Sequence, residues 1–106
     1  MIQLRPARYW YTINSSELSK QISTSPGREI VAVLVTGGGG AAAVRVYDSP
    51  VGSGEPSPSK DSFLVSANTG ESVPFCPSHP VLFKKGLYIE LEQGAASNGE
   101  ATIFYN

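Results

Sequence analysis

The amino-acid sequence predicts an all-β domain, an antiparallel β-sandwich or jelly roll of seven to nine short strands. Short segments rich in β-branched and aromatic residues follow one another at roughly ten-residue spacing. Eleven glycines and eight prolines separate these segments within a chain of 106 residues. No segment has the apolar period of a long helix. The length corresponds to one domain, spanning residues 1–106.

The segment Glu29–Asp48 is the centre of this prediction and reads EIVAVLVTGGGGAAAVRVYD. Two β-branched runs flank four glycines, which predicts a buried β-hairpin whose turn, Gly37–Gly40, uses positive φ angles. The uninterrupted apolar run Ile30–Val35 predicts a strand covered on both faces. The alternating segment Val44–Tyr47 predicts a return strand with one buried and one wetter face.

The N-terminal segment Arg8–Ile13 is rich in aromatic residues and predicts a strand, within a possible arm or edge strand over residues 1–13. Alternation places Trp10 on one face, where the simplest prediction is a core position. Tyr9 and Tyr11 fall on the other face and could form an interface or a carbohydrate-stacking platform. The next segment, Glu17–Ser23, fits either one helical turn or a strand, and the β pattern around it favours a strand.

Further strands are predicted at 61–67, 72–75, 81–83, 86–92 and 100–105. In the strand 86–92, Leu87, Ile89 and Leu91 are expected to face inward. Residues 49–59, SPVGSGEPSPS, are rich in proline, glycine and serine, which predicts a flexible surface loop.

Composition and charge argue against several classes of function. The net charge is −1 with no block of basic residues, which disfavours binding to nucleic acid or to a membrane surface. The chain shows neither a signal-peptide pattern nor an apolar run long enough for a transmembrane helix. A single cysteine indicates synthesis in a reducing compartment. Charged residues make up only 16%, which is typical of a protein that buries part of its surface in an assembly.

The chemically interesting residues have simpler structural interpretations. Gly37–Gly40 is not followed by the lysine and hydroxyl that a phosphate-binding loop requires. Cys76 and His79 could form a nucleophilic pair, but a half-buried cysteine beside an exposed histidine in a proline-rich connection is the expectation. They are also too few for a structural zinc site. We therefore expect no catalytic residue, no metal and no cofactor.

Two groups of carboxylates also have simpler structural interpretations. Glu90 and Glu92 share the outward face of one strand, where an acid–base pair is possible but a solvated face is expected. Asp48, Glu55 and Asp61 bracket the proline-rich loop and could bind calcium weakly. They lack the close alternating spacing of a dedicated calcium loop.

Three segments carry a family resemblance: GGGGAAAVRVYD, FKKGLYIELEQG and the terminal EATIFYN. Together, over residues 28–106, they resemble small virion structural proteins of tailed bacteriophages. This resemblance implies a non-enzymatic β-sandwich at a virion surface, either a capsid decoration (cement) protein or a fibre-associated domain. No functional residue carries over with it, because the matching motifs are structural.

We therefore expect a structural protein that binds and stabilises a lattice of major capsid protein, located at the capsid surface and assembled in the host cytoplasm. The alternative is a fibre-associated domain that binds a receptor or glycan. A homo-oligomer is expected, and a trimer would suit the local threefold positions of a capsid. The residues expected to contact the partner lie in the N-terminal arm and the proline-rich loop: Leu4, Arg5, Tyr9, Trp10, Tyr11, Val51, Glu55, Pro56 and Pro58.

Overall fold

The computed structural model describes residues 7–50, 62–93 and 98–106. These residues form nine β-strands and no helix, which confirms the predicted all-β class. The strands are β1 (Tyr9–Asn14), β2 (Ser19–Ser23), β3 (Arg28–Thr36), β4 (Ala42–Tyr47), β5 (Ser62–Ala67), β6 (Ser72–Phe75), β7 (Val81–Phe83), β8 (Leu87–Gln93) and β9 (Glu100–Tyr105).

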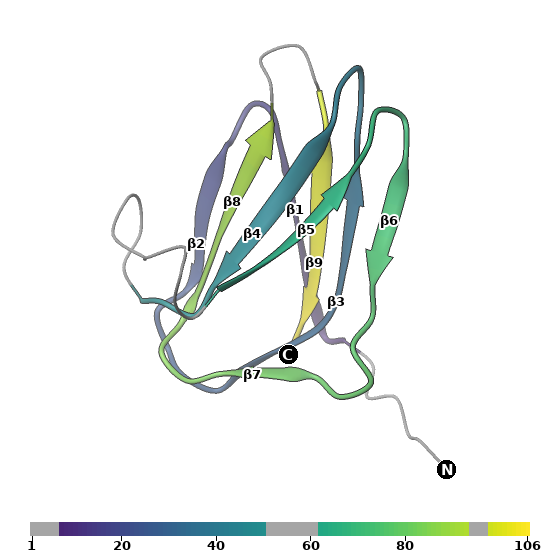
Figure 1. Ribbon diagram of the computed structural model, residues 1–106. Coiled ribbons are helices and arrows are strands. Elements are labelled where there is room, and N and C mark those ends of the chain that lie inside the picture. Colours follow the sequence, from purple (N-terminus) through teal and green to yellow (C-terminus); the bar gives the residue numbers. More distant parts are fainter. Residues whose placement is uncertain (1–6, 51–61, 94–97) are drawn as a thin grey trace.

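The strands form two antiparallel sheets that pack face to face (Figure 1). Sheet A has the order β1-β9-β3-β6, and β7 also pairs with β3 beyond the end of β6. Sheet B has the order β2-β8-β4-β5. Most connections cross from one sheet to the other, so sequential strands are seldom neighbours. This is the strand order of a jelly roll, in which two Greek keys form a double sheet.

The core lies between the sheets and is built from alternate residues of each strand. Its fully buried side chains are branched aliphatics: Ile13, Ile30, Val33, Val35, Val44, Val46, Leu87, Ile89 and Ile103. The prediction that Leu87, Ile89 and Leu91 face inward is confirmed. Burying each such side chain stabilises the fold by roughly 1.5–3 kcal/mol before entropy is counted. Branched aliphatic side chains thus form the centre of the interface between the two sheets.

The predicted central hairpin is wrong, because β3 belongs to sheet A and β4 to sheet B. The Gly37–Gly40 segment crosses between the sheets, and the hairpin partner of β4 is β5. None of these four glycines has a positive φ angle; the positive-φ glycines of the described chain are Gly27 and Gly70. Gly37 is required for a different reason: a Cβ atom there would clash with the backbone carbonyl of Asn68.

The expectation that Ile30–Val35 is covered on both faces is also wrong. Ile30, Val33 and Val35 are buried in the core, whereas Leu34 is 37% exposed on the outer face of sheet A. The register of β3 against β9 shifts between Ile30 and Ala32. This bulge adds one residue to the strand. The buried positions Ile30 and Val33 are therefore three residues apart, where regular alternation would place them an even number of residues apart. An apolar run can therefore contain a bulge and still leave one face open.

The segment between β6 and β7 is irregular, as its prolines predict. Both strands pair with β3, so they are two parts of one edge of sheet A that Cys76–Pro80 interrupts. The open choice at Glu17–Ser23 is resolved as strand β2, which begins at Ser19. A turn precedes it, in which the Glu17 amide donates to the Asn14 carbonyl at 3.0 Å.

Candidate binding surfaces

Trp10 is not a core residue. It is 69% exposed, the most exposed large hydrophobic side chain of the described residues. β1 alternates as predicted, but the face that carries Trp10 is the outer one and not the core face. Ile13 is buried and Tyr11 packs against the core, so Trp10 and Thr12 must point outward from sheet A.

The outward residues of the neighbouring strands extend the apolar surface around Trp10. Trp10 lies opposite Phe104 on β9, and Phe104 lies opposite Ala32 on β3. In the next row, Leu34 of β3 lies opposite Pro74 of β6. We call this set, Trp10, Phe104, Ala32, Leu34 and Pro74, the Trp10 face. It runs across four strands, and its rigidity comes from the sheet rather than from a loop.

Polar side chains border the Trp10 face on one side. The Thr12 and Thr102 hydroxyls lie 2.8 Å apart, and those of Thr36 and Ser72 lie 3.1 Å apart. Each pair joins adjacent strands across the outer face. Apolar residues bordered by polar groups are the usual arrangement of a protein contact surface.

Tyr9 and Tyr11 point toward the other sheet, not to the Trp10 face. Tyr9 packs on Tyr105 with ring centroids 5.5 Å apart, and the guanidinium of Arg28 lies 5.8 Å from the centre of its ring. Tyr9 remains 48% exposed because it lies beyond the end of the core. Two of the three predicted aromatic contact residues, Tyr9 and Trp10, are therefore available to a partner, on different faces.

Tyr11 closes the side of the sandwich where β1 and β2 meet. Its hydroxyl donates to the Glu17 carboxylate, and the ammonium of Lys20 lies 5.6 Å from the centre of its ring. The hydrogen bond to Glu17, with burial and the negative charge adding to it, raises the pKa of Tyr11 to about 12. Tyr11 is thus engaged in structure and is a poor candidate for partner binding.

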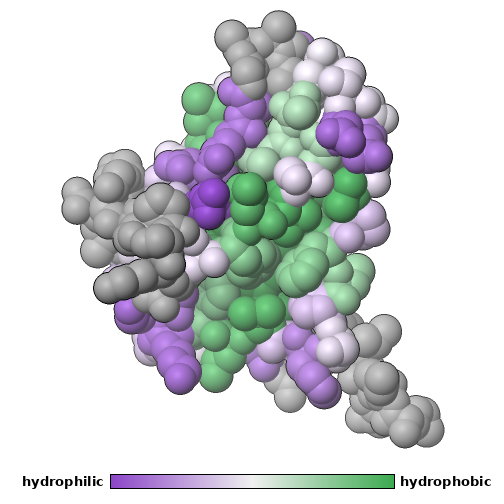
Figure 2. All heavy atoms as spheres, in the orientation of Figure 1, coloured by the Kyte–Doolittle hydropathy of each residue, from purple (hydrophilic) through white to green (hydrophobic). Residues whose placement is uncertain are grey.

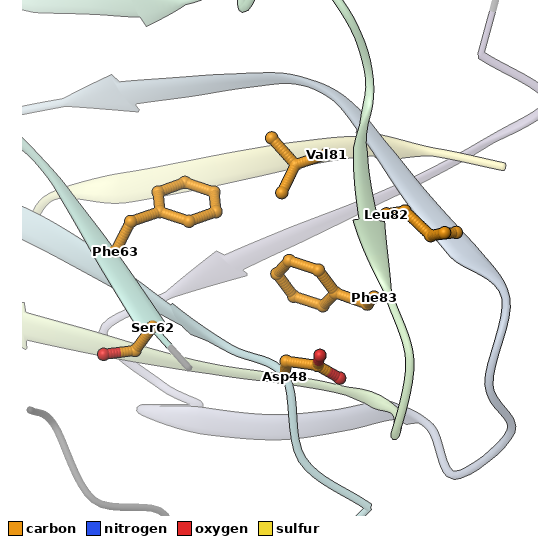
Figure 3. A pocket seen from close by; sticks show the side chains of 6 residues that line it. All are labelled: Asp48, Ser62, Phe63, Val81, Leu82 and Phe83. Atoms are coloured by element: carbon orange, nitrogen blue, oxygen red, sulfur yellow. The ribbon is translucent and has the colours of Figure 1, made fainter. Parts of the chain in front are cut away.

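A hollow lies on the side of the sandwich opposite to Tyr11, between β5 and β7. It has a volume of about 230 Å³ and is lined by Asp48, Ser62, Phe63, Val81, Leu82 and Phe83. In Figure 2, hydrophobic surface is concentrated over β5 and toward β7, with hydrophilic residues around it. Figure 3 shows Phe63, Val81 and Phe83 converging, while Leu82 points away. The hollow fits a small apolar group and contains no acid–base pair.

Asp48, at the border of this hollow, is a structural residue. Its carboxylate accepts backbone hydrogen bonds from Lys84 at 3.0 Å, Lys85 at 2.7 Å and Gly86 at 3.2 Å. It therefore fixes the turn between β7 and β8. Of the three carboxylates of the suggested calcium site, Asp48 lies within the described residues, and Glu55 and Asp61 lie outside them.

The paired carboxylates on β8 also have structural partners. Glu92 accepts a hydrogen bond from Arg45 Nε at 3.1 Å, and Glu90 accepts one from the Tyr47 hydroxyl at 3.3 Å. Burial of Tyr47, the negative charge of Glu90 and this hydrogen bond raise the pKa of the Tyr47 hydroxyl. Neither carboxylate lines the described hollow.

The remaining candidates from the sequence are the pair Cys76 and His79, a metal site and the other predicted contact residues. Cys76 is exposed, not half-buried as expected, and His79 is exposed; no hydrogen bond joins them. In the described part of the chain, no group of three His, Cys, Asp or Glu side chains could hold a metal ion. The same residues include no helix long and apolar enough to cross a membrane. The predicted contact residues Leu4, Arg5, Val51, Glu55, Pro56 and Pro58 lie outside the described residues.

Comparisons with known proteins add little. No family model and no curated protein matches the chain. Among solved structures, the chain is similar to one described as "Crystal structure of PirA", with a TM-score of 0.38 and 16% sequence identity over 92% of this chain and 84% of that one. A likeness this weak carries no functional argument.

Proposed function

We propose that this protein is a non-enzymatic virion structural protein, a capsid decoration protein that attaches to the shell through the Trp10 face. The observation that carries the proposal is the exposure of Trp10 at 69% on a sheet face shared with Phe104 and Leu34. Tryptophan is strongly enriched among the residues that dominate binding energy. A soluble domain gains nothing in its own stability from such exposure, so a partner surface is the simplest explanation.

Three further features support the proposal. The chain has few charged residues, as expected when part of its surface is covered in an assembly. The described carboxylates with catalytic potential, such as Glu90 and Glu92, have partners that stabilise the sandwich. The sandwich architecture and the resemblance to small virion proteins agree with each other. Many weak contacts repeated over a lattice give strong total attachment through avidity.

The test compares Trp10→Ala with Leu64→Ala. Leu64 is 45% exposed on β5, in the other sheet, and serves as the matched control. Truncating a tryptophan that dominates an interface typically costs about 2 kcal/mol or more of binding, roughly 30-fold in Kd. We expect Trp10→Ala to reduce shell occupancy in a sedimentation assay with little change in melting temperature, and Leu64→Ala to bind normally. Unchanged occupancy of Trp10→Ala would exclude this face as the attachment surface.

The second candidate is a fibre-associated domain that binds a receptor or glycan. It is favoured by the arrangement of an exposed indole ring beside the Thr12 and Thr102 hydroxyls. An aromatic ring stacks on the apolar face of a sugar, and hydroxyl groups nearby can hydrogen-bond its rim. Quenching or blue shift of the fluorescence of Trp10, the single tryptophan of the chain, on titration with glycans would favour this candidate over shell binding.

A further inference from the structure

β1 is an unprotected sheet edge in the described part of the protein. Exposed strand edges offer unpaired N–H and C=O groups to any other strand, and proteins usually block them with proline, charge or a bulge. β1 pairs with β9 on one side, and no other strand of the described residues pairs with its second side. Its residues YWYTIN contain no proline and no charge, and its register with β9 is continuous from Tyr9 to Asn14.

Three other edges carry such protection. β2 contains Lys20, which is exposed, and its register against β8 shifts between Gln21 and Ser23. β6 contains Pro74, and β7 has only three residues. β5, like β1, has no proline or charge. β1 differs from β5 in its exposed aromatic residues, Trp10 at 69% and Tyr9 at 48%, and we therefore select β1 as the edge for pairing.

We infer that β1 pairs with β1 of a second copy of this chain, antiparallel, and joins two A sheets into one continuous sheet. A second copy fits because β1 carries no charge, so two copies meet without repulsion; the same pairing at β2 would bring two Lys20 side chains together. It also brings the exposed aromatic residues of two copies side by side, since Trp10 is 69% and Tyr9 48% exposed in the isolated chain. The inference does not depend on what the Trp10 face binds.

Antiparallel pairing of identical strands fixes the symmetry. The twofold axis must be perpendicular to the sheet, so outward residues of one copy lie beside outward residues of the other. The registers with the most pairs centre on Tyr11 or on Thr12. In either case the two Thr12 side chains lie opposite or diagonal to each other, and both Trp10 faces point the same way. The dimer would thus present one doubled aromatic surface, instead of the trimer expected from the sequence.

The test places charge at the edge. Thr12→Lys brings two ammonium groups close together across the axis, where like charges destabilise a strand pair. We expect the wild type to form a concentration-dependent dimer in sedimentation equilibrium. Thr12→Lys should raise the dimer Kd by about tenfold or more. The control Ser66→Lys places the same charge on the outward face of β5 and should remain dimeric.

A charge-swap experiment guards against misfolding of the variant. Thr12→Glu should also be monomeric, and an equimolar mixture of Thr12→Lys with Thr12→Glu should recover a heterodimer, because opposite charges now face each other. Misfolded variants would not recover. A wild type that stays monomeric up to about 100 μM, a trimer, a dimeric Thr12→Lys, a monomeric Ser66→Lys, or a mixture that stays monomeric would each overturn the inference.

Discussion

The hydrogen bonds of Asp48 yield a quantitative stability prediction. Asp48→Ala removes the acceptor of three backbone N–H groups, those of Lys84, Lys85 and Gly86. Each hydrogen bond contributes roughly 0.5–1.5 kcal/mol net, and more when the acceptor is charged. Lys84 and Lys85 are exposed, so water replaces part of the loss there, whereas Gly86 is buried. We therefore expect the free energy of unfolding to fall by about 2–3 kcal/mol.

Urea denaturation followed by far-ultraviolet circular dichroism measures this loss. With a denaturant slope of roughly 1–3 kcal/mol/M, the midpoint should move down by about 0.7–3 M. Glu92→Ala is the matched control: it removes an exposed carboxylate paired with Arg45, and such pairs contribute about 1 kcal/mol or less. If Asp48→Ala shifts the midpoint no further than Glu92→Ala, the carboxylate does not hold the turn and the reasoning fails.

Three other predictions follow from the described contacts. Gly37→Ala should lower the melting temperature by several degrees in differential scanning calorimetry, because the added methyl group meets a backbone carbonyl that cannot move away easily. The raised pKa of Tyr11, about 12 against 10 when unfolded, contributes stability that is complete below pH 10 and lost as pH rises toward 12; in Glu17→Gln this alkaline loss should be smaller in pH-dependent denaturation. Cys76→Ser and His79→Ala should each leave partner binding unchanged in the shell assay, since the two side chains are exposed and not joined.

The strand positions could be predicted from sequence because the relevant signals are local. Alternation of apolar and polar residues, and the placement of glycine and proline, located each of the nine strands to within a few residues. The pairing of strands could not be predicted in the same way. A glycine-rich connection between two apolar runs is compatible with a hairpin within one sheet and with a crossing between two sheets. The choice depends on contacts with the distant turn at Asn68.

The candidate binding surface shows the same limit at the level of single residues. The alternation of β1 separates Trp10 and Thr12 from Tyr11 and Ile13, but it does not say which set is inside. Large aromatic residues are usually buried, and that general preference gave the wrong answer for Trp10. Ile13 indicates the inner face correctly, since a β-branched aliphatic residue is usually buried and Ile13 is fully buried here. The role of Asp48 had no sequence signal, because its three donors lie far along the chain.

The central position of β9 in sheet A determines the order in which the protein can fold. β9 separates β1 from β3 and pairs with both along its length, yet it comes after every other strand in the chain. During synthesis, β1 and one edge of β3 therefore cannot form their hydrogen bonds to β9 until residues 100–105 have left the ribosome. Pairing between Tyr9 and Tyr105 closes a loop of nearly the whole chain, and contacts of such long range make folding slow. Until that moment the aromatic strand β1 is open to other nascent chains, so aggregation competes with folding during synthesis more than it does in the finished protein.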